Sequence, residues 1–456
     1  MMLTRTIAIA WLTIREAVRS KLLLSLTCLL VAGLFGLPML IAGDNTLEGK
    51  VQVILTYTLA FATGLLSLTT LWTACGGLSS EIQDRRLYLV LTKPLHRHEL
   101  WLGKWLGIMG LNIALMGLSG LIISAMTHHA IRNSGDSLKI KRQVSEQFLL
   151  ARLAVPPLTP DWSQTLSAAT QRLLQSGRIP TNMTPEAIRQ KLIEEIKIQH
   201  FTIPPGGGVQ FSFQIPAKFK HGHDLLLRYK FDSTRPERNP VAAQWTIGTA
   251  PGPLTHIGVT NYPGIPAVLV LDAQSTAGSN LITVAYQRQD TQSQATLLFA
   301  DTTQEPELLM PCGSFEMNLI RGLFVILCRL AFLAALGLTA GCLLSTPVAL
   351  FTAFFILILM ASAGYVESVA TTGVFYIPHE GPALDPNWLD RAILHIFRGF
   401  NVITHPLIQL DPAPLLASGR VVGGKMVLLA LGWLAGLYSA ISALIGIALF
   451  NRRELG

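Results

Sequence analysis

The feature that most constrains this chain is a charged stretch, Ser79 to Lys104, which lies between two long apolar runs. The run before it, Val51 to Ser80, and the run after it, Trp105 to Thr127, contain no Asp, Glu, Lys or Arg. Each run exceeds the roughly 20 residues that an α-helix needs to cross a bilayer. The charged stretch is therefore predicted to be a loop that joins two membrane helices.

Positive charge gives this loop an expected orientation. The short turn Asp44 to Lys50 carries a single cation, whereas the loop carries several. Because cytoplasmic loops are enriched in Lys and Arg, the loop is predicted to lie in the cytoplasm. A long loop that is charged and partly apolar favours docking of a soluble partner. Its cations are Arg85, Arg86, Lys93, Arg97 and Lys104.

Composition agrees with a membrane protein. Only 14% of the 456 residues are charged and the mean hydropathy is +0.45, whereas soluble domains carry about 25% charged residues. Much of the net charge of +8 lies beside apolar runs, so it indicates membrane orientation and no nucleic-acid binding is expected. Four of the five cysteines lie within apolar runs and Cys312 stands alone, which favours neither a disulfide framework nor a metal-binding pair.

Six membrane helices and one interfacial helix are expected. Residues 1–21 carry apolar side chains at helical spacing among basic ones, which is typical of a cytoplasmic amphipathic helix in the membrane interface. The alternative is a plain stretch of flanking positive charge. A cleaved signal peptide is disfavoured, because no small-residue cleavage site follows the first apolar run. The predicted spans are 22–43, 51–80, 105–127, 318–344, 347–369 and 426–451.

Residues 128–317 are expected to form an α+β domain outside the cytoplasm. Thr184-Pro185-Glu186 resembles a helix start, and residues 138–203 are predicted to be mainly helical. Alternating apolar residues then predict short strands, and residues 209–310 are predicted to form a β-sandwich of jelly-roll type. The expected strands are 209–215, 225–231, 244–247, 267–271, 281–287 and 295–299.

The chain's end completes this topology. Residues 385–400 form an amphipathic segment that is predicted to lie outside, as an interfacial or re-entrant helix. The last span is followed by Arg452 and Arg453. Both termini are therefore expected in the cytoplasm, and the chain is expected in the inner (plasma) membrane.

Three charged residues fall within or near predicted spans. Arg329 lies near the middle of the fourth span, where a charge costs about 3 kcal/mol and should face protein or water. Arg321 and Glu367 lie closer to the outer ends, and their depths suit one another. The functional hypothesis is that Arg329 lines either a translocation path or a dimer interface. The structural alternative is an ion pair or a side chain that reaches the interface.

The segment Gly419 to Met426 nearly matches a phosphate-binding loop. Met426 stands where that motif needs Ser or Thr, and no strand is predicted before it. The segment His221 to Asp224 has ligand-type residues without a spaced second cluster, which favours a solvated turn over a metal site. No catalytic arrangement has a suitable spacing, so no enzymatic activity, cofactor or metal is expected in this chain.

The order of these parts resembles the membrane subunit of type 2 ABC transporters, or ABC-2 type permeases. It is similar to the six-helix kind known as copper-enzyme maturation permeases. The resemblance rests on REAVRSK near the N-terminus, on EIQDRRLYLVLTKPLHRHELWLGKWLG after the second span, and on ALFNRREL at the end. The long insertion between the third and fourth spans departs from compact members of the family.

The resemblance implies a partner that hydrolyses ATP. In this family the loop after the second span forms a coupling helix that docks on the ATPase subunit. It also implies that ATP and Mg²⁺ bind in the partner, and that two permeases, identical or different, assemble with two ATPases in the bilayer to export a substrate. The implied coupling residues are Glu81, Asp84, Arg85, Arg86, Lys93, Pro94 and Arg97.

A second class of function stays open at this point. The membrane helices could serve as an anchor for a binding or sensing protein whose periplasmic sandwich holds the ligand. The sequence specifies neither cargo nor ligand.

Overall fold

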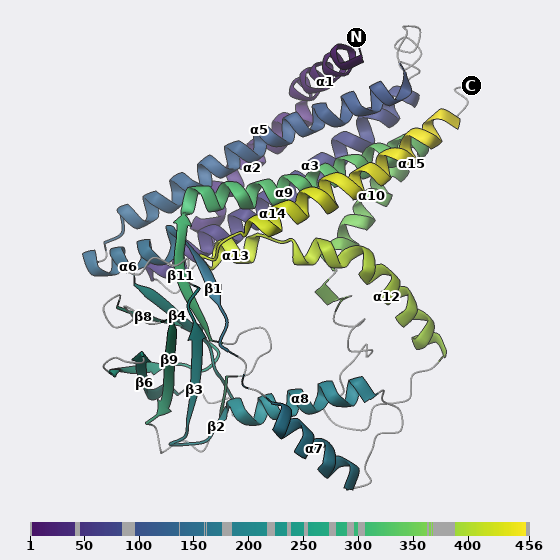
Figure 1. Cartoon of the computed structure of the whole chain (residues 1–456). Coiled ribbons are helices and arrows are strands. Elements are labelled where there is room, and N and C mark those ends of the chain that lie inside the picture. Colours follow the sequence, from purple (N-terminus) through teal and green to yellow (C-terminus); the bar gives the residue numbers. More distant parts are fainter. Residues whose placement is uncertain are drawn as a thin grey trace. The chain divides into compact units, whose positions relative to one another are not determined.

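The computed structural model describes residues 2–41, 46–83, 96–135, 137–158, 160, 162–175, 185–216, 224–234, 239–249, 254–272, 280–289, 296–299, 306–362, 364–365, 367 and 388–452. The chain divides into two compact units. The helical unit comprises Met1–Leu149 and Ser314–Gly456, and the strand unit comprises Leu150–Gly313. Figure 1 shows the elements of both units.

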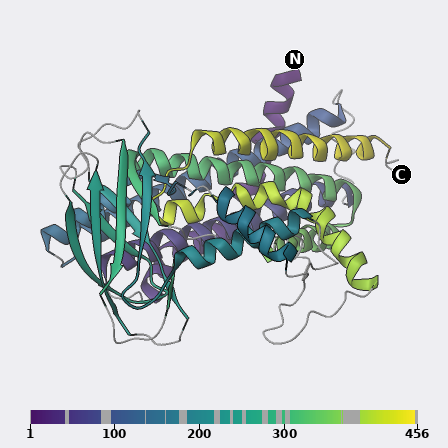
Figure 2. The ribbon, with the colours of Figure 1, turned by 60° about the horizontal axis from the view of Figure 1, so that its bottom comes forward.

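The helical unit is a bundle of long apolar helices, several of which run side by side (Figures 1 and 2). Within it, α3 contacts α2, α5, α9 and α10, and α9 contacts α15. The helices are α1 (Met2–Arg19), α2 (Lys21–Leu40), α3 (Leu47–Gln83), α5 (Arg97–Arg132), α6 (Leu138–Phe148), α9 (Phe315–Leu343), α10 (Thr346–Ala361), α12 (Trp388–Gln409), α13 (Ala413–Ala417), α14 (Gly424–Ala430), η1 (Leu431–Tyr438) and α15 (Ser439–Arg452).

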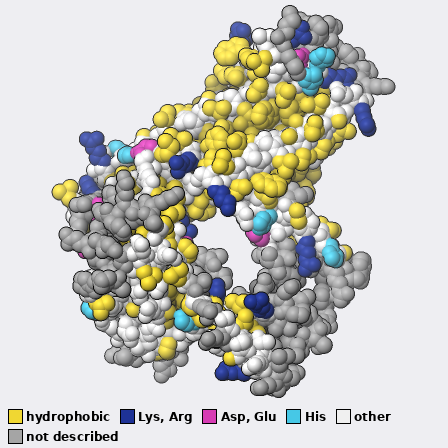
Figure 3. All heavy atoms as spheres, in the orientation of Figure 1, with side chains coloured by type: hydrophobic (Ala, Val, Ile, Leu, Met, Phe, Trp, Pro, Cys, Tyr) yellow, Lys and Arg dark blue, Asp and Glu magenta, His cyan; other side chains and the backbone are white. Residues whose placement is uncertain are grey.

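Five helical segments are long and apolar enough to cross a membrane, and they coincide with five of the six predicted spans. They are α2, α3, α5, α9 and the continuous helix α14–η1–α15. The remaining predicted span, 347–369, corresponds to α10, which has only 16 residues. Hydrophobic side chains cover most of the visible face of these helices (Figure 3). The chain is therefore a multi-pass helical membrane protein with a separate β-rich unit.

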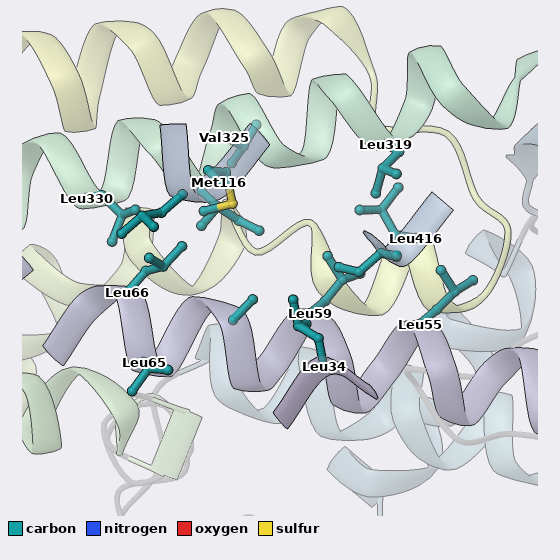
Figure 4. Close-up of a cluster of buried hydrophobic side chains, with 14 of the residues drawn as sticks. Leu34, Leu55, Leu59, Leu65, Leu66, Met116, Leu319, Val325, Leu330 and Leu416 are labelled. Atoms are coloured by element: carbon teal, nitrogen blue, oxygen red, sulfur yellow. The ribbon is translucent and has the colours of Figure 1, made fainter. Parts of the chain in front are cut away.

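The centre of the bundle is the contact between α3 and α9. Leu59 and Leu66 of α3 lie in one buried cluster with Leu319 and Leu330 of α9 (Figure 4). Glycine lets these helices approach closely, because a Cβ atom at Gly341 would lie 2.9 Å from the carbonyl oxygen of Cys75. The small residues in these spans therefore set the spacing of the bundle.

Helix α1 is present as predicted, and its apolar stripe is exposed. Leu3 and Trp11 are 74% and 67% exposed, while the other side of the helix packs on α5. There, a Cβ atom at Gly103 would lie 2.6 Å from Ile9, and one at Gly107 would lie 2.7 Å from Thr13. The stripe is thus free to contact lipid, which fits an interfacial helix.

The amphipathic segment predicted at 385–400 begins in residues outside the described ones and is longer than expected. Helix α12 continues through Pro406 to Gln409, and the short helix α13 follows it. Leu416 of α13 is 2% exposed and packs over Gly322 of α9, where a Cβ atom would lie 2.4 Å from it. The chain between the last two predicted spans therefore returns into the bundle core.

The strand unit contains two four-stranded sheets and a short three-stranded one. Their strand orders are β1-β11-β4-β8, β3-β9-β6-β7 and β2-β10-β5. The strands are β1 (Leu150–Val155), β2 (Thr202–Ile203), β3 (Gly208–Gln214), β4 (Leu225–Tyr229), β5 (Asp232–Ser233), β6 (Val241–Thr249), β7 (Thr255–Asn261), β8 (Ala267–Leu271), β9 (Leu281–Arg288), β10 (Leu297–Leu298) and β11 (Glu307–Ser314). Helices α7 (Ser163–Gln175) and α8 (Pro185–Phe201) precede β2.

The two larger sheets share one aromatic core. Phe213 and Trp245 come from one sheet and Tyr229 from the other, and all three belong to a single buried cluster. Tyr286 packs edge-on against Trp245, with ring centroids 4.9 Å apart. Burial raises the pKa of both Tyr229 and Tyr286 above the usual value for tyrosine.

The strand unit is smaller than the domain predicted at 128–317. Helix α5 continues to Arg132, and α6 belongs to the helical unit. Within the region predicted as helical, 138–203, residues Leu150–Val155 form β1 instead. Its neighbour β11 lies at the other end of the unit's sequence. The local pattern of apolar residues therefore could not predict that β1 pairs with β11.

Candidate functional site

The charged loop predicted at 79–104 is framed by the end of α3 and the start of α5. Residues 79–83 continue α3, and α5 begins at Arg97. Glu81 and Lys104 face each other across this frame, with Lys104 Nζ 2.6 Å from Glu81 Oε1. The side chain of Lys104 is only 6% exposed and that of Glu81 is 20% exposed. A largely buried ion pair therefore joins the two helices at the base of the connection.

The start of α5 is fixed by a cap. The backbone N–H of His96 donates to Glu99 Oε2 at 3.0 Å, which is half of the reciprocal capping box. Glu99 is 1% exposed. The ring of His96 stacks on that of His98, with centroids 5.2 Å apart. This cap fixes the first turn of α5.

Arg97 ties the same place to the C-terminal helix. Its guanidinium donates a hydrogen bond to the carbonyl oxygen of Phe450 in α15. It also lies over the ring of Phe450, 5.3 Å from the centroid, in cation–π geometry. Arg97, one of the predicted coupling residues, is therefore anchored to α15.

The end of α3 is also bonded to the turn between α9 and α10. Ser79 Oγ donates to the carbonyl oxygen of Leu344 at 3.1 Å, and Thr346 Oγ1 donates to Ser79 Oγ at 3.0 Å. Together with the contacts of Lys104 and Arg97, these bonds connect α3, α5, α9, α10 and α15 at one end of the bundle. We call this end, where α3 finishes and α5 starts, the loop end.

Two of the seven predicted coupling residues, Glu81 and Arg97, lie at this base. The other five, Asp84, Arg85, Arg86, Lys93 and Pro94, lie outside the described residues. Sequence reasoning missed the partner of Glu81, because Lys104 lies 23 positions away and across the connection. The available signal was that Lys104 directly precedes a run without charge.

Arg321 and Arg329 lie on α9, and Glu367 follows α10. Arg321 is exposed on α9, and Glu367 Oε1 lies 3.6 Å from His405 Nε2 of α12. Among the described residues, Asp411, which follows α12, is a carboxylate that acts electrostatically on Arg329. The Nε atom of Arg329 is buried and has no hydrogen-bond partner among the described residues. Chain re-entry after α12 therefore supplies an acid that the sequence pattern had not connected with Arg329.

The segment Gly419 to Met426 is not built as a phosphate-binding loop. Helix α13, and not a strand, precedes it. The side chain of Asn318 donates to the carbonyl oxygen of Arg420 at 2.8 Å and accepts from the N–H of Val422 at 2.7 Å. Residues 217–223, which include His221, lie outside the described residues. Among the described residues, no group of three potential metal ligands is present.

Comparison with known proteins finds a family match for the first third of the chain. A family model described as ABC-2 family transporter protein matches residues 7–155, which run from α1 to β1 and include the base of the connection. No curated protein and no solved structure matches the chain. The similarity to copper-enzyme maturation permeases stays a prediction. Residues 7–155 are thus similar to the ABC-2 transporter family, whose members are membrane permease components that work with an ABC ATPase.

Proposed function

We propose that this chain is the permease half of an ATP-driven exporter, and that a separate ATPase moves its helices through the connection between α3 and α5. The observation that carries this proposal is the bonding at the loop end. Glu81 and Lys104 join α3 to α5, and Arg97 joins α5 to α15. A force applied to the connection would therefore reach several membrane helices at once.

The lengths of α3 and α5 support this role. They have 37 and 36 residues, which at 1.5 Å per residue gives each a length of about 55 Å. The hydrocarbon core of a bilayer is only about 30 Å thick. Both helices therefore extend beyond the hydrocarbon core of the bilayer. A movement of the ATPase at one end of these helices would be transmitted along them through the membrane.

The topology and assembly belong to the same proposal. Six spans, with α10 as the short fifth one, put both termini and residues 84–95 in the cytoplasm and the strand unit outside the inner membrane. The excess of Lys and Arg in the connection supports this orientation. Two permease copies, identical or different, would assemble with two ATPases that bind ATP and Mg²⁺.

We assign the strand unit to the jelly-roll class. The orders β1-β11-β4-β8 and β3-β9-β6-β7 support this assignment, because each sheet interleaves strands from the two ends of the sequence. The antiparallel pairing of β3 with β9 and of β6 with β9 agrees with it.

A second candidate function uses this unit as a receptor on a membrane anchor. The outward positions of the β3-β9-β6-β7 sheet carry amides and hydroxyls without charge, for example Gln210, Gln244 and Thr246. His256 of β7 extends the same row and lies 3.0 Å from Thr246 Oγ1. An uncharged polar face of this kind favours binding of a neutral polar ligand, as a sensing protein would require.

Co-purification with the ATPase separates the two functions. The chain should retain an ABC ATPase through membrane extraction, and the double reversal Arg85→Glu with Arg86→Glu should weaken that association. The matched control is Arg172→Glu with Arg189→Glu, which changes charge equally on exposed positions of α7 and α8. We expect the control to bind the ATPase as the wild type does.

The opposite outcomes are also defined. A wild-type chain that inserts stably but never associates with an ATPase would favour the anchored receptor. If the wild type and the Arg85/Arg86 variant associate equally with the ATPase, the connection between α3 and α5 is not part of the surface that binds it.

A further inference from the structure

A cavity of about 330 Å³ opens in the helical unit at the loop end. Its wall includes Thr13 and Glu16 of α1, Trp72 and Gly77 of α3, and Lys104 of α5. Ligand pockets in proteins typically measure about 300–1,000 Å³, so this cavity lies at the small end of that range. Its size suits a single apolar chain better than a whole two-chain lipid.

Two glycines of α3 leave this space open. A Cβ atom at Gly76 or Gly77 would meet nothing within 4 Å. By contrast, Gly341 of α9 is closed by the backbone of α3, because a Cβ atom there would lie 2.9 Å from the carbonyl oxygen of Cys75. The remaining wall is largely apolar, with Leu78 and Ile108 among its residues. The cavity is thus an apolar slot near the close contact between α3 and α9 at Gly341.

The charges on the wall select a headgroup. Lys104 is already neutralised by Glu81 at 2.6 Å. Glu16 is exposed and brings a carboxylate to the same wall. Trp72 is 45% exposed and also lines the cavity. A carboxylate attracts an ammonium group electrostatically, and an aromatic ring on the same cavity wall can also attract a cation through its face.

The position of α1 gives such a ligand access. The apolar stripe of this helix is exposed at Leu3, Ile7 and Val18, which places the helix at the boundary between headgroups and acyl chains. Its opposite side carries Thr13 and lines the cavity. An amphiphile in the adjoining leaflet therefore meets the slot at the depth of its own headgroup.

We propose that this cavity binds one acyl chain of an ethanolamine phospholipid from the leaflet at the loop end, with the ammonium group at Glu16. Since Lys104 forms part of the wall, the bound lipid also contacts the ion pair at the base of the connection. This proposal does not depend on the proposed transport role. If the chain does not associate with an ATPase, the lipid should still bind in the cavity.

The test uses the full chain in detergent micelles, titrated with lysophosphatidylethanolamine and followed by native mass spectrometry. Gly77→Leu should fill the slot, whereas Gly64→Leu, an exposed position on α3 outside the cavity, is the matched control. Each buried methylene changes affinity about fourfold, so displacing two or more should weaken binding by more than about tenfold. The control should bind as the wild type does.

A second arm tests the headgroup. Lysophosphatidylglycerol has the same chain without the amine, and the wild type should bind it more weakly. Glu16→Gln should remove that preference while leaving the acyl chain bound. Should Gly77→Leu unfold, Gly76→Val offers a smaller filling with the same expected direction. Equal affinity of the wild type and the filled variants would overturn the site, and equal affinity for both lipids would overturn the role of Glu16.

Discussion

The ion pair between Glu81 and Lys104 makes a quantitative prediction about the loop end. At 2.6 Å and an effective dielectric constant of about 20, the attraction amounts to about 6 kcal/mol before desolvation is subtracted. Removing one partner of a buried pair typically costs about 3–5 kcal/mol, because the other charge stays buried. Lys104 is 6% exposed, so Glu81→Gln should lower the free energy of unfolding by about 3 kcal/mol.

The double variant separates this mechanism from simple loss of contact. Lys104→Met alone should cost less, about 2 kcal/mol, because Glu81 is 20% exposed and keeps some contact with water. Combining Glu81→Gln with Lys104→Met leaves no buried charge, and the double variant should lose only about 1 kcal/mol. The two single effects should therefore be strongly non-additive.

The assay is reversible denaturation of the purified chain in mixed micelles, applied to the wild type and the three variants. A cost below about 1 kcal/mol for Glu81→Gln would class the pair with exposed ion pairs, which contribute little. Additive single effects would likewise refute the reasoning, because they would mean that neither charge depends on the other. In both cases the base of the connection would not be held by this pair.

Three further predictions concern other parts of the chain. Arg329→Leu should leave insertion and ATPase association intact but reduce transport in reconstituted vesicles; unchanged transport would make Arg329 structural. Gly341→Leu should destabilise the bundle by at least about 2 kcal/mol, because its Cβ atom would lie 2.9 Å from the Cys75 carbonyl, whereas Gly36→Leu, with nothing within 4 Å, should not. Since burial raises the pKa of Tyr229 and Tyr286, their contribution to stability is complete below the unfolded value of about 10 and is lost as the pH rises toward the folded values. The tyrosinate absorbance of these two residues, measured above that of the exposed tyrosines, should therefore appear together with loss of the strand unit's circular dichroism, and titration of both residues before unfolding would contradict this.

The membrane helices were predictable because the bilayer restricts the sequence along their whole length. The absence of charge from Val51 to Ser80 and from Trp105 to Thr127 located α3 and α5. It did not locate their ends, since a helix continues past the apolar region wherever local residues allow. Helix α5 starts at Arg97, eight residues before the uncharged run. The full length of these helices was therefore not visible from hydropathy.

Pairings between distant residues were the part that sequence could not supply. Lys104 has to meet Glu81 across a connection, and Asp411 comes near Arg329 only because the chain re-enters the bundle after α12. In the strand unit, β1 neighbours β11 although almost the whole unit separates them in sequence. Such contacts depend on tertiary packing, which a local period of 2 or 3.6 residues does not encode.

The near match to a phosphate-binding loop shows how packing decides what a glycine-rich segment does. Gly419 has a φ of 71°, and a Cβ atom there would lie 2.5 Å from the carbonyl oxygen of Gln147 in α6. Only glycine fits this turn without strain. The amide of Asn318 then binds the backbone at Arg420 and Val422. A phosphate cradle needs free backbone N–H groups that converge on an anion, whereas here the N–H of Val422 is already donated to α9. These residues therefore fasten the end of α13 and the start of α14 to the bundle, and the resemblance of their spacing to a nucleotide site has a structural cause.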